Sequence, residues 1–491
     1  MGKCKFSDTI YDTVSVEEGH NAPTQSKVYG LSRTLFFLVA IYTMLTISRF
    51  MWAFPPFYDM LLSSGAFAWL CEGTTAPVII EGVKQPFLCL AQDEAISRIY
   101  SLITGSVLIS SIFAGAFNLI LGAKKCGMIG SALIFCGTIL MGVSNENFRA
   151  HHAAAVLLGL GMDAVSFPCF NSTLLFPGHE LFVTSILASG ISVGMALPLL
   201  MKLLFEKFTL SFATLMIWYA FLAPGLCFIL YTLFYPPNRF YKQHELDTAL
   251  QYILSNAEDS PKVGVEDDVA HSPLENESKD SDDHSIKMRI LSAFGISNQN
   301  YDLLCKSLLS MHFLLITVVF ICVMLTSVFY MSASSQLLSN HHRNVLAIGM
   351  PLAFIPCVVL SPLLDRLGSM FVLWFEVIFE FFMILFLWVN SNVARFISIA
   401  CYSFYASYLN GQLWVFSVET FDPSIHTFML GLLSFVGGIS ALIAPYAYGL
   451  FIEGSDSGIA NGIPLFLGIV VIQIIVLGFL HVVKHKKNKI F

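Results

Sequence analysis

The chain has 491 residues, of which 56% are hydrophobic, 14% aromatic and only 12% charged, with a mean hydropathy of +0.72. Soluble globular chains carry about 25% charged residues, so this composition excludes a single soluble domain and indicates a protein that crosses a membrane repeatedly. The net charge of −7 comes mainly from polar loops, and no basic stripe interleaved with aromatic residues supports nucleic-acid binding.

Hydrophobic segments recur along the chain, and each is long enough to cross a bilayer. A span needs about 20 mostly apolar residues, and it must be helical because hydrocarbon cannot satisfy an unpaired backbone. We therefore predict an all-α polytopic membrane protein with twelve transmembrane helices. The predicted spans are roughly 34–60, 97–118, 127–144, 152–175, 181–204, 212–235, 307–331, 344–364, 369–390, 395–417, 427–451 and 462–483.

The spans divide the chain into five parts. A cytoplasmic tail is followed by a six-helix bundle, a cytoplasmic and partly disordered linker, a second six-helix bundle and a basic cytoplasmic tail. Their predicted bounds are 1–33, 34–235, 236–306, 307–483 and 484–491. The linker is acidic and rich in Ser, Asp and Glu, a composition that buries too little apolar surface to fold.

The distribution of basic residues predicts the orientation. Most of the 26 Lys and Arg residues face one side if both termini are cytoplasmic, and the positive-inside rule favours that arrangement. Cys71 and Cys89 both lie in the polar segment after the first span, which is then outside the cytoplasm. Disulfides persist in such a compartment, so we predict a Cys71–Cys89 bridge. The cysteines show no metal-ligand spacing, and no metal site is predicted.

Two groups of six spans around a long middle loop resemble the major facilitator superfamily. In that fold, two six-helix halves are related by an axis along the membrane normal and enclose a site near the midplane. The resemblance implies that spans 1, 4, 7 and 10 line the site. A channel, or another transporter fold with twelve spans, is the alternative.

The short loop after the eighth span strengthens this resemblance. It reads Asp365-Arg366-Leu367-Gly368, and an Asp-Arg-x-Gly loop between two spans is a recognised feature of the superfamily. The aspartate can cap the next helix, where the macrodipole favours an anion, and the arginine can pair with carboxylates on nearby helix ends. A solvated polar turn is the alternative. The predicted gate consists of Asp365, Arg366, Gly368, Glu376 and Glu419.

The corresponding loop of the first half departs from this pattern. Leu119 and Ile120 stand where the aspartate and arginine would be, although Gly115 and Gly122 are kept. We therefore do not expect a gate of the usual kind there.

Two glutamates lie within the ninth span. Glu376 and Glu380 are four residues apart, on one face of the helix, which suits a proton or cation site. The resemblance makes helix 9 peripheral, however, and Glu376 is within reach of the Asp-Arg loop. We expect structural pairing near the cytoplasmic face instead.

Several stretches resemble one branch of the superfamily. They are GAFAWLC at 65–71, Gln-Asp-Glu at 92–94 leading into 99–115, the segment 127–142, LLGLGMDAVSFPCFNSTLLFP at 157–177, and Asn-Gly-Gln-Leu-Trp at 410–414. These are similar to the facilitative large-neutral-amino-acid transporters and the related apicomplexan amino-acid transporters. The resemblance implies facilitative, sodium-independent transport of an amino acid at a cell surface, without a cofactor. It does not decide between neutral and cationic substrates, or between uniport, exchange and proton coupling.

Two ionisable residues lie near the middle of cavity-lining spans. Arg49 is in the first span and Asp163 in the fourth, and ionisable side chains within a span are functional candidates because they are costly there. Arginine can bind a substrate carboxylate bidentately, and the aspartate can take an ammonium group. The alternative is a salt bridge that only holds helices 1 and 4 together.

Polar and aromatic residues of spans 1, 4, 7 and 10 complete the predicted binding site. Plain packing is the alternative for each aromatic residue. The predicted substrate-binding residues are Arg49, Trp52, Asp163, Phe167, Asn171, Tyr330, Asn410, Gln412 and Trp414.

Other functions remain open at this point. A carrier of a sugar, nucleoside or organic anion, or a receptor that does not transport, is an alternative to an amino-acid carrier. An enzyme is not expected, because the sequence shows no cluster of catalytic polar residues at one depth, and ATP-driven pumping is not expected, because it shows no phosphate-binding glycine-rich loop.

Overall fold

A computed structural model describes most of the chain between residues 32 and 487. The described residues are 32–71, 79–80, 83–84, 89–176, 180–236, 301–356, 359, 368–389, 391–409, 413, 416–417, 420–421, 425–452 and 462–487. The predicted tail at 1–33 and linker at 236–306 therefore lie almost entirely outside them, as does the last half of the tail at 484–491.

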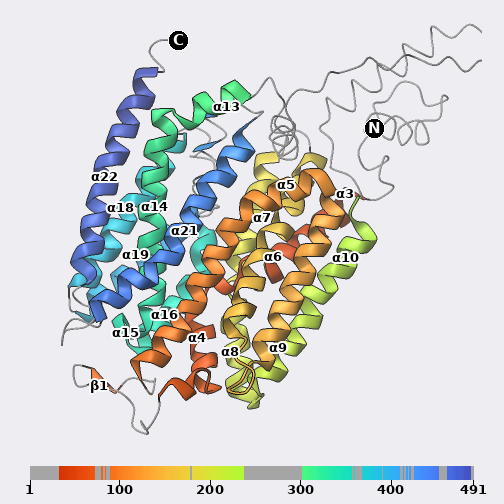
Figure 1. Cartoon of the computed structure of the whole chain (residues 1–491), viewed down its shortest axis with the longest axis vertical. Helices are drawn as coiled ribbons and strands as arrows, with labels where there is room; N and C mark the ends of the chain where they lie inside the picture. The colour runs from red at the N-terminus through yellow and green to blue at the C-terminus, as the bar shows by residue number, and fades with distance from the viewer. Residues whose placement is uncertain are drawn as a thin grey trace, which may run out of the picture.

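Long helices dominate both halves of the described chain (Figure 1). The first half contains α3 (Arg33–Thr43), the π-helix η2 (Met44–Ser48), η3 (Phe50–Trp52), α4 (Phe54–Ser63), η4 (Ala68–Leu70), α5 (Leu90–Val143), α6 (His151–Asn171), η5 (Ser172–Leu175), α7 (Glu180–Gly194), α8 (Leu197–Phe208), α9 (Phe212–Ala220), η6 (Phe221–Gly225) and α10 (Leu226–Phe234). The two-residue strands β1 (Ile79–Ile80) and β2 (Val83–Lys84) pair antiparallel between η4 and α5.

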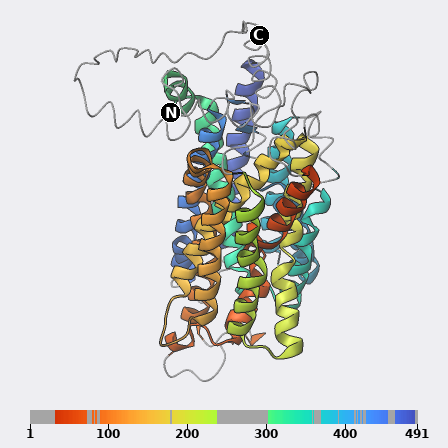
Figure 2. The ribbon, with the colours of Figure 1, turned by 90° about the vertical axis from the view of Figure 1, so that its right-hand side faces the viewer.

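The second half is built in the same way. It contains α13 (Tyr301–Leu308), α14 (Met311–Ser332), α15 (Ser334–Leu337), α16 (Asn340–Gly349), η8 (Pro351–Ala353), α18 (Ser369–Trp388), α19 (Asn392–Leu409), α21 (His426–Ile452) and α22 (Gly462–Lys487). Figures 1 and 2 show that the start of α3 and the end of α22 lie at one end of the bundle, here called the tail end. The opposite end carries α4, α15 and β1, and is here called the disulfide end.

Ten helical segments of the described chain are long and apolar enough to cross a membrane. They match ten of the twelve predicted spans. The predicted span 344–364 is described only as far as α16 and η8, with a few residues beyond, and the span 395–417 mainly by α19. The multi-pass, all-helical class predicted from the sequence is confirmed.

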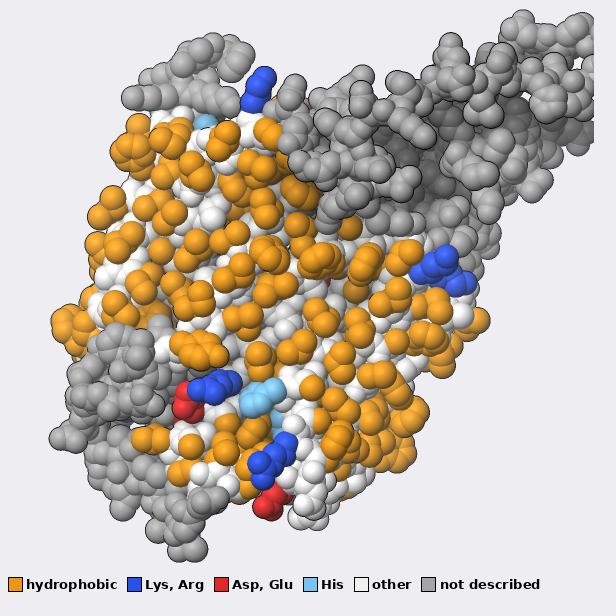
Figure 3. Space-filling model, in the orientation of Figure 1, with side chains coloured by type: hydrophobic (Ala, Val, Ile, Leu, Met, Phe, Trp, Pro, Cys, Tyr) orange, Lys and Arg blue, Asp and Glu red, His pale blue; other side chains and the backbone are white. Residues whose placement is uncertain are grey.

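Hydrophobic side chains cover the middle of the face seen in Figure 3, while charged side chains gather toward its ends. The exposed apolar residues lie on the outer helices; examples are Trp218, Phe221, Leu233, Ile475 and Phe479. Such a belt is stable next to lipid and would be costly in water.

The first span is not one continuous helix. The π-helix η2 ends at Arg49, whose backbone has φ −135° and ψ 33°; a single 3-10 turn, η3, follows, and α-helix resumes only after Ala53. Pro55 and Pro56 stand at the start of α4, and proline cannot donate to the carbonyl four residues earlier. The break therefore leaves irregular backbone inside a span, and such segments often form substrate sites in transporters.

Glycines at matching places in the two halves adopt the same conformation. Gly122 lies between spans 2 and 3, within α5, with φ 81° and ψ 166°; Gly368 precedes α18 with φ 75° and ψ 177°. These values are in the region that favours glycine. The first-half loop thus keeps the turn geometry of the Asp-Arg-x-Gly loop without its charged pair.

The two halves touch at backbone distance along α5 and α21. A Cβ atom added to Gly438 would lie 2.8 Å from the backbone nitrogen of Ile109 and 2.9 Å from the carbonyl oxygen of Gly105. A Cβ on Gly431 would be 3.1 Å from the Cα of Ile112. Small residues are what permit such a close approach of membrane helices.

Candidate functional site

An ion pair bridges the break in the first span and the middle of α6. Arg49 Nη2 donates to Asp163 Oδ1 at 2.9 Å, with the arginine side chain 15% exposed and the aspartate 4%. The guanidinium carbon lies 4.8 Å from the centroid of the Trp52 ring. Next to it, the hydroxyl groups of Ser48 and Ser166 are 2.7 Å apart. Both residues that the sequence selected on depth and charge are thus in direct contact.

Trp52, beside Arg49, has an indole N–H group without a hydrogen-bond acceptor in the described chain. Its side chain is buried, and its indole Nε1 has no hydrogen-bond partner within the described part of the chain. An orphan donor beside a guanidinium group favours an anionic acceptor, since a buried donor left unpaired costs about 1–3 kcal/mol. The Arg49 region therefore offers positive charge and an N–H group on one side, and the Asp163 carboxylate on the other.

The remaining predicted substrate-binding residues lie elsewhere or outside the described chain. Phe167 packs against Ala114, Cys126 and Ala164. Asn171 ends α6 and is half-buried. Residues 410, 412 and 414 (Asn410, Gln412 and Trp414) lie outside the described residues.

Tyr330 is fully buried in the second half. Its ring stacks on Tyr402 with centroids 4.7 Å apart, and its hydroxyl is 3.3 Å from that of Ser398. These contacts favour the packing role that the sequence left open, and a contact with substrate stays a prediction.

The predicted gate is described only in part. Asp365, Arg366 and Glu419 lie outside the described residues. Gly368 has the positive φ expected of a tight turn, and Glu376 is fully buried in α18. The pairing of Glu376 with Arg366 stays a prediction.

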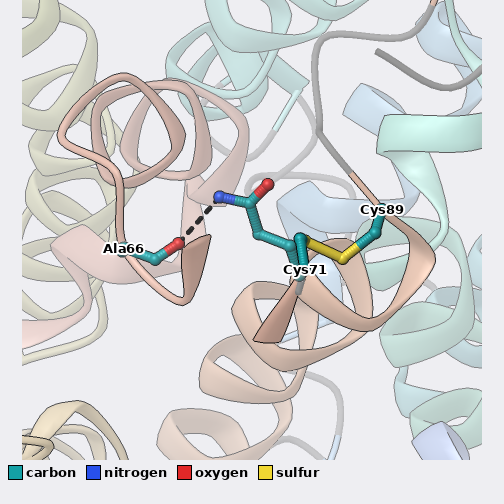
Figure 4. Close-up of a disulfide and its surroundings, with 4 residues drawn as sticks. Ala66, Cys71 and Cys89 are labelled. Carbon is teal, nitrogen blue, oxygen red and sulfur yellow. Dashed lines mark hydrogen bonds between the residues drawn. A yellow bond between two sulfur atoms is a disulfide. The ribbon is translucent and has the colours of Figure 1, made fainter. Parts of the chain in front are cut away.

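The first outer segment is held by a disulfide, as the sequence predicts. Cys71 and Cys89 are joined, with their Cα atoms 5.7 Å apart (Figure 4). Close to this bridge, Gln92 Nε2 donates to the Ala66 carbonyl at 2.9 Å. A bridge over 18 positions contributes about 3 kcal/mol by limiting the unfolded chain, so it fixes the connection between α4 and α5.

A charged network that the sequence analysis missed joins the two halves at the disulfide end. Asp59 on α4 pairs with Lys202 on α8 at 2.7 Å and with Arg343 on α16 at 3.2 Å. Lys202 also donates to Asn344 Oδ1 at 3.1 Å, and the Arg343 guanidinium lies 5.5 Å from the Tyr58 ring centroid. Asp59 and Lys202 belong to the first half, whereas Arg343 and Asn344 belong to the second.

A second set of cross-half hydrogen bonds lies next to this network. The Asp93 carboxylate is fully buried; it accepts from the Tyr58 hydroxyl and, at 2.5 Å, from Gln336 Nε2 on α15. Ser97 donates to the Ser332 carbonyl at 3.0 Å. Together with the Asp59 network, these bonds link the halves across the disulfide end.

The comparison with protein families decides the class. The model of the Major Facilitator Superfamily matches residues 90–445, which is well over half of the chain. The chain belongs to the major facilitator superfamily. Membership confirms the predicted fold class and places the protein among membrane transporters rather than enzymes.

Curated relatives of this superfamily member cover most of its length. The chain is 24% identical to "Arginine transporter 1" of Toxoplasma gondii, covering 96% of this chain and 92% of the relative. It is 25% identical to "Aromatic and large neutral amino acid transporter 5-3" of Toxoplasma gondii, with 84% and 77% covered. It is 23% identical to "Cationic amino acid transporter 8" of Plasmodium berghei, with 73% and 72% covered.

Solved structures show the same fold at low identity. A POT family transporter in complex with a thioalcohol-conjugated peptide matches with a TM-score of 0.58 and 11% identity, covering 95% of this chain and 99% of that one. A mutant of the peptide transporter POT in complex with sulfate matches with a TM-score of 0.56 and 13% identity, covering 96% and 98%.

Proposed function

We propose that this protein is a facilitative carrier that moves amino acids across the plasma membrane by alternating access. Its superfamily and the amino-acid transport named in three of its relatives support this function. The relatives are named for cationic as well as for aromatic and large neutral substrates, so the proposal covers amino acids as a class.

The observation that carries the proposal is the Arg49–Asp163 pair at the break in the first span. Every free amino acid has one carboxylate and one ammonium group close together. The substrate carboxylate would bind Arg49 and the unpartnered Trp52 N–H, while the ammonium group would bind Asp163. The Arg49–Asp163 ion pair would then be replaced by two ion pairs, one between Arg49 and the substrate carboxylate and one between Asp163 and the substrate ammonium group. Each charge keeps an opposite charge beside it, which limits the cost of desolvation.

The cross-half network at the disulfide end supports a carrier that is closed on that side. We place this end outside the cell and both termini in the cytoplasm, because the disulfide suits an oxidising compartment and the basic residues favour that orientation. Opening toward the outside requires the bonds of Asp59 and Asp93 to the second half to break.

The test is counterflow uptake by pure protein in liposomes. Vesicles loaded with unlabelled amino acid should accumulate labelled arginine, leucine or phenylalanine without any ion gradient. Arg49→Ala should abolish this uptake, whereas Arg149→Ala, which removes an exposed arginine at the disulfide end, should not. Uptake of a sugar, nucleoside or organic anion in place of every amino acid would overturn the substrate class, and binding without uptake would indicate a receptor.

A further inference from the structure

Two glutamates are buried in the second half, and no cation pairs with them among the residues that the structure describes. Glu376 and Glu380 on α18 both have no exposed surface. Neither oxygen of Glu376, nor Oε1 of Glu380, has a hydrogen-bond partner among the residues that the structure describes. Glu380 Oε2 accepts from Gln473 Nε2 of α22 at 2.9 Å. Helix α18 begins at Ser369, so Glu376 lies about 10 Å along the helix axis from the start of α18.

Gln473 gives independent support for a binding site here. This side chain is also fully buried, is directed at Glu380, and its Oε1 has no partner in the described chain. The Gln473 amide thus contacts Glu380, and Glu376 lies one helical turn away on the same face of α18, so acceptor oxygens are in excess over donors. Buried acceptors without donors are costly, so the cluster favours a ligand that supplies hydrogen.

Side chains of two neighbouring helices face the pair. From α14, Cys322 and Thr326 approach Glu380; from α19, Tyr405 approaches both glutamates. The Tyr405 hydroxyl donates to the Val323 carbonyl at 3.0 Å, and Thr326 donates to the Cys322 carbonyl at 3.0 Å. None of these groups is a cation.

The basic side chain of Lys484 on α22 is engaged elsewhere. Lys484, eleven residues after Gln473 on α22, donates to Ser369 at 2.7 Å and lies over the Phe416 ring. No ion pair of the described residues involves Glu376 or Glu380. Two ionised carboxylates here would be close, buried and uncompensated, which costs several kcal/mol for each charge and more for their repulsion.

We propose that Glu376, Glu380 and Gln473 form a proton-binding site in the second half of the carrier, separate from the Arg49–Asp163 pair. A proton supplies the missing donor: protonated Glu376 can donate a hydrogen bond to the free oxygen of Glu380, four residues further along the helix. A metal ion fits less well, because hard cations require about six oxygen ligands and the described residues hold no cluster of three metal-ligating side chains. This inference does not depend on which solute is carried.

Infrared spectroscopy of the purified protein at neutral pH tests the site directly. Buried protonated carboxyl groups give a C=O stretching band that is distinct from that of carboxylates and shifts in heavy water. We expect this band in the unaltered protein and its loss in Glu376→Gln/Glu380→Gln. The matched control Glu146→Gln, an exposed glutamate at a loop, should keep the band. If the double variant does not fold, each single variant should lose part of the band.

The pH dependence of thermal stability gives a second measurement. A proton held by the folded protein at neutral pH is released by the unfolded chain, so its stabilising effect is lost as pH rises. The Tm of the unaltered protein should therefore fall more steeply between pH 6 and pH 9 than that of the double glutamine variant. Absence of the protonated band at neutral pH, or equal slopes, would overturn the proposal. A rise in Tm with sodium over choline, lost in the double variant, would overturn it in favour of a cation.

Discussion

Removing the Asp59 carboxylate should open the disulfide end of the carrier. Asp59→Asn removes a carboxylate shared by two cations: Lys202, 14% exposed at its side chain, and Arg343, 4% exposed. Breaking a buried ion pair costs about 3–5 kcal/mol, but Asp59 is itself 19% exposed, so solvent screens part of the loss. Because the Arg343 contact joins the halves, we expect the closed state to lose about 1–3 kcal/mol relative to the open one. The population ratio then changes roughly 5- to 150-fold.

Spin labels across the disulfide end can measure this shift. Cysteines introduced at Ser64 and Ser391 lie on exposed positions of the two halves, in a protein whose exposed Cys136 is replaced. Pulsed electron resonance should show a longer-distance population in Asp59→Asn that is minor in the unaltered protein. The control is Glu206→Gln, because Glu206 lies 3.8 Å from Lys202 on the same helix and does not reach the second half. Identical distance distributions in Asp59→Asn and the unaltered protein would refute a closing role for the network.

Two further predictions concern the site and the interface. If Arg49–Asp163 only holds helices together, each single alanine variant should lose about 3–5 kcal/mol of stability, and the double variant should regain both folded protein and uptake. A double variant that folds but shows no counterflow assigns the pair to substrate. Gly438→Leu should separate α5 and α21 and lower both Tm and transport, because its Cβ would lie 2.8 Å from backbone. Gly468→Leu, which has nothing within 4 Å of its Cβ position, should change neither property, and an equal loss in both would contradict the interface argument.

Hydropathy was sufficient to predict the helical fold, because the backbone hydrogen bonds of each span are made within that span. A membrane helix closes its hydrogen bonds within one segment, so its existence can be predicted without its neighbours. The ten matched spans follow from this, and so does the Arg49–Asp163 contact in part, since depth and opposite charge left few other partners. The break at Arg49 was missed because averaging over a span hides local geometry. Its signal was Pro55-Pro56, which was available in the sequence.

Contacts between helices far apart in the chain could not be predicted in the same way. Asp59, Lys202 and Arg343 each look like an ordinary charge at the end of a span, and only the packing of the halves brings them together. Glu376 and Glu380 present the opposite case. Their spacing was visible in the sequence, but the absence of hydrogen-bond donors around them in the described chain was not, and it is this absence that supports a proton-binding site. The pairing of Glu376 with Arg366, which lies outside the described residues, stays a prediction.

The positions of the Arg49–Asp163 pair, the Asp59 network and the glutamate pair determine how these three groups can act together. The Arg49–Asp163 pair lies wholly within the first half, so substrate bound there shifts the carrier between states only if its affinity differs between them. The Asp59 network joins the halves and therefore changes with the state by itself. The glutamate pair lies within the second half, where α18 and α22 carry it together. Substrate that also contacts the second half would bias closure directly, and the predicted residues there are Tyr330 on α14 and Asn410, Gln412 and Trp414 of span 10.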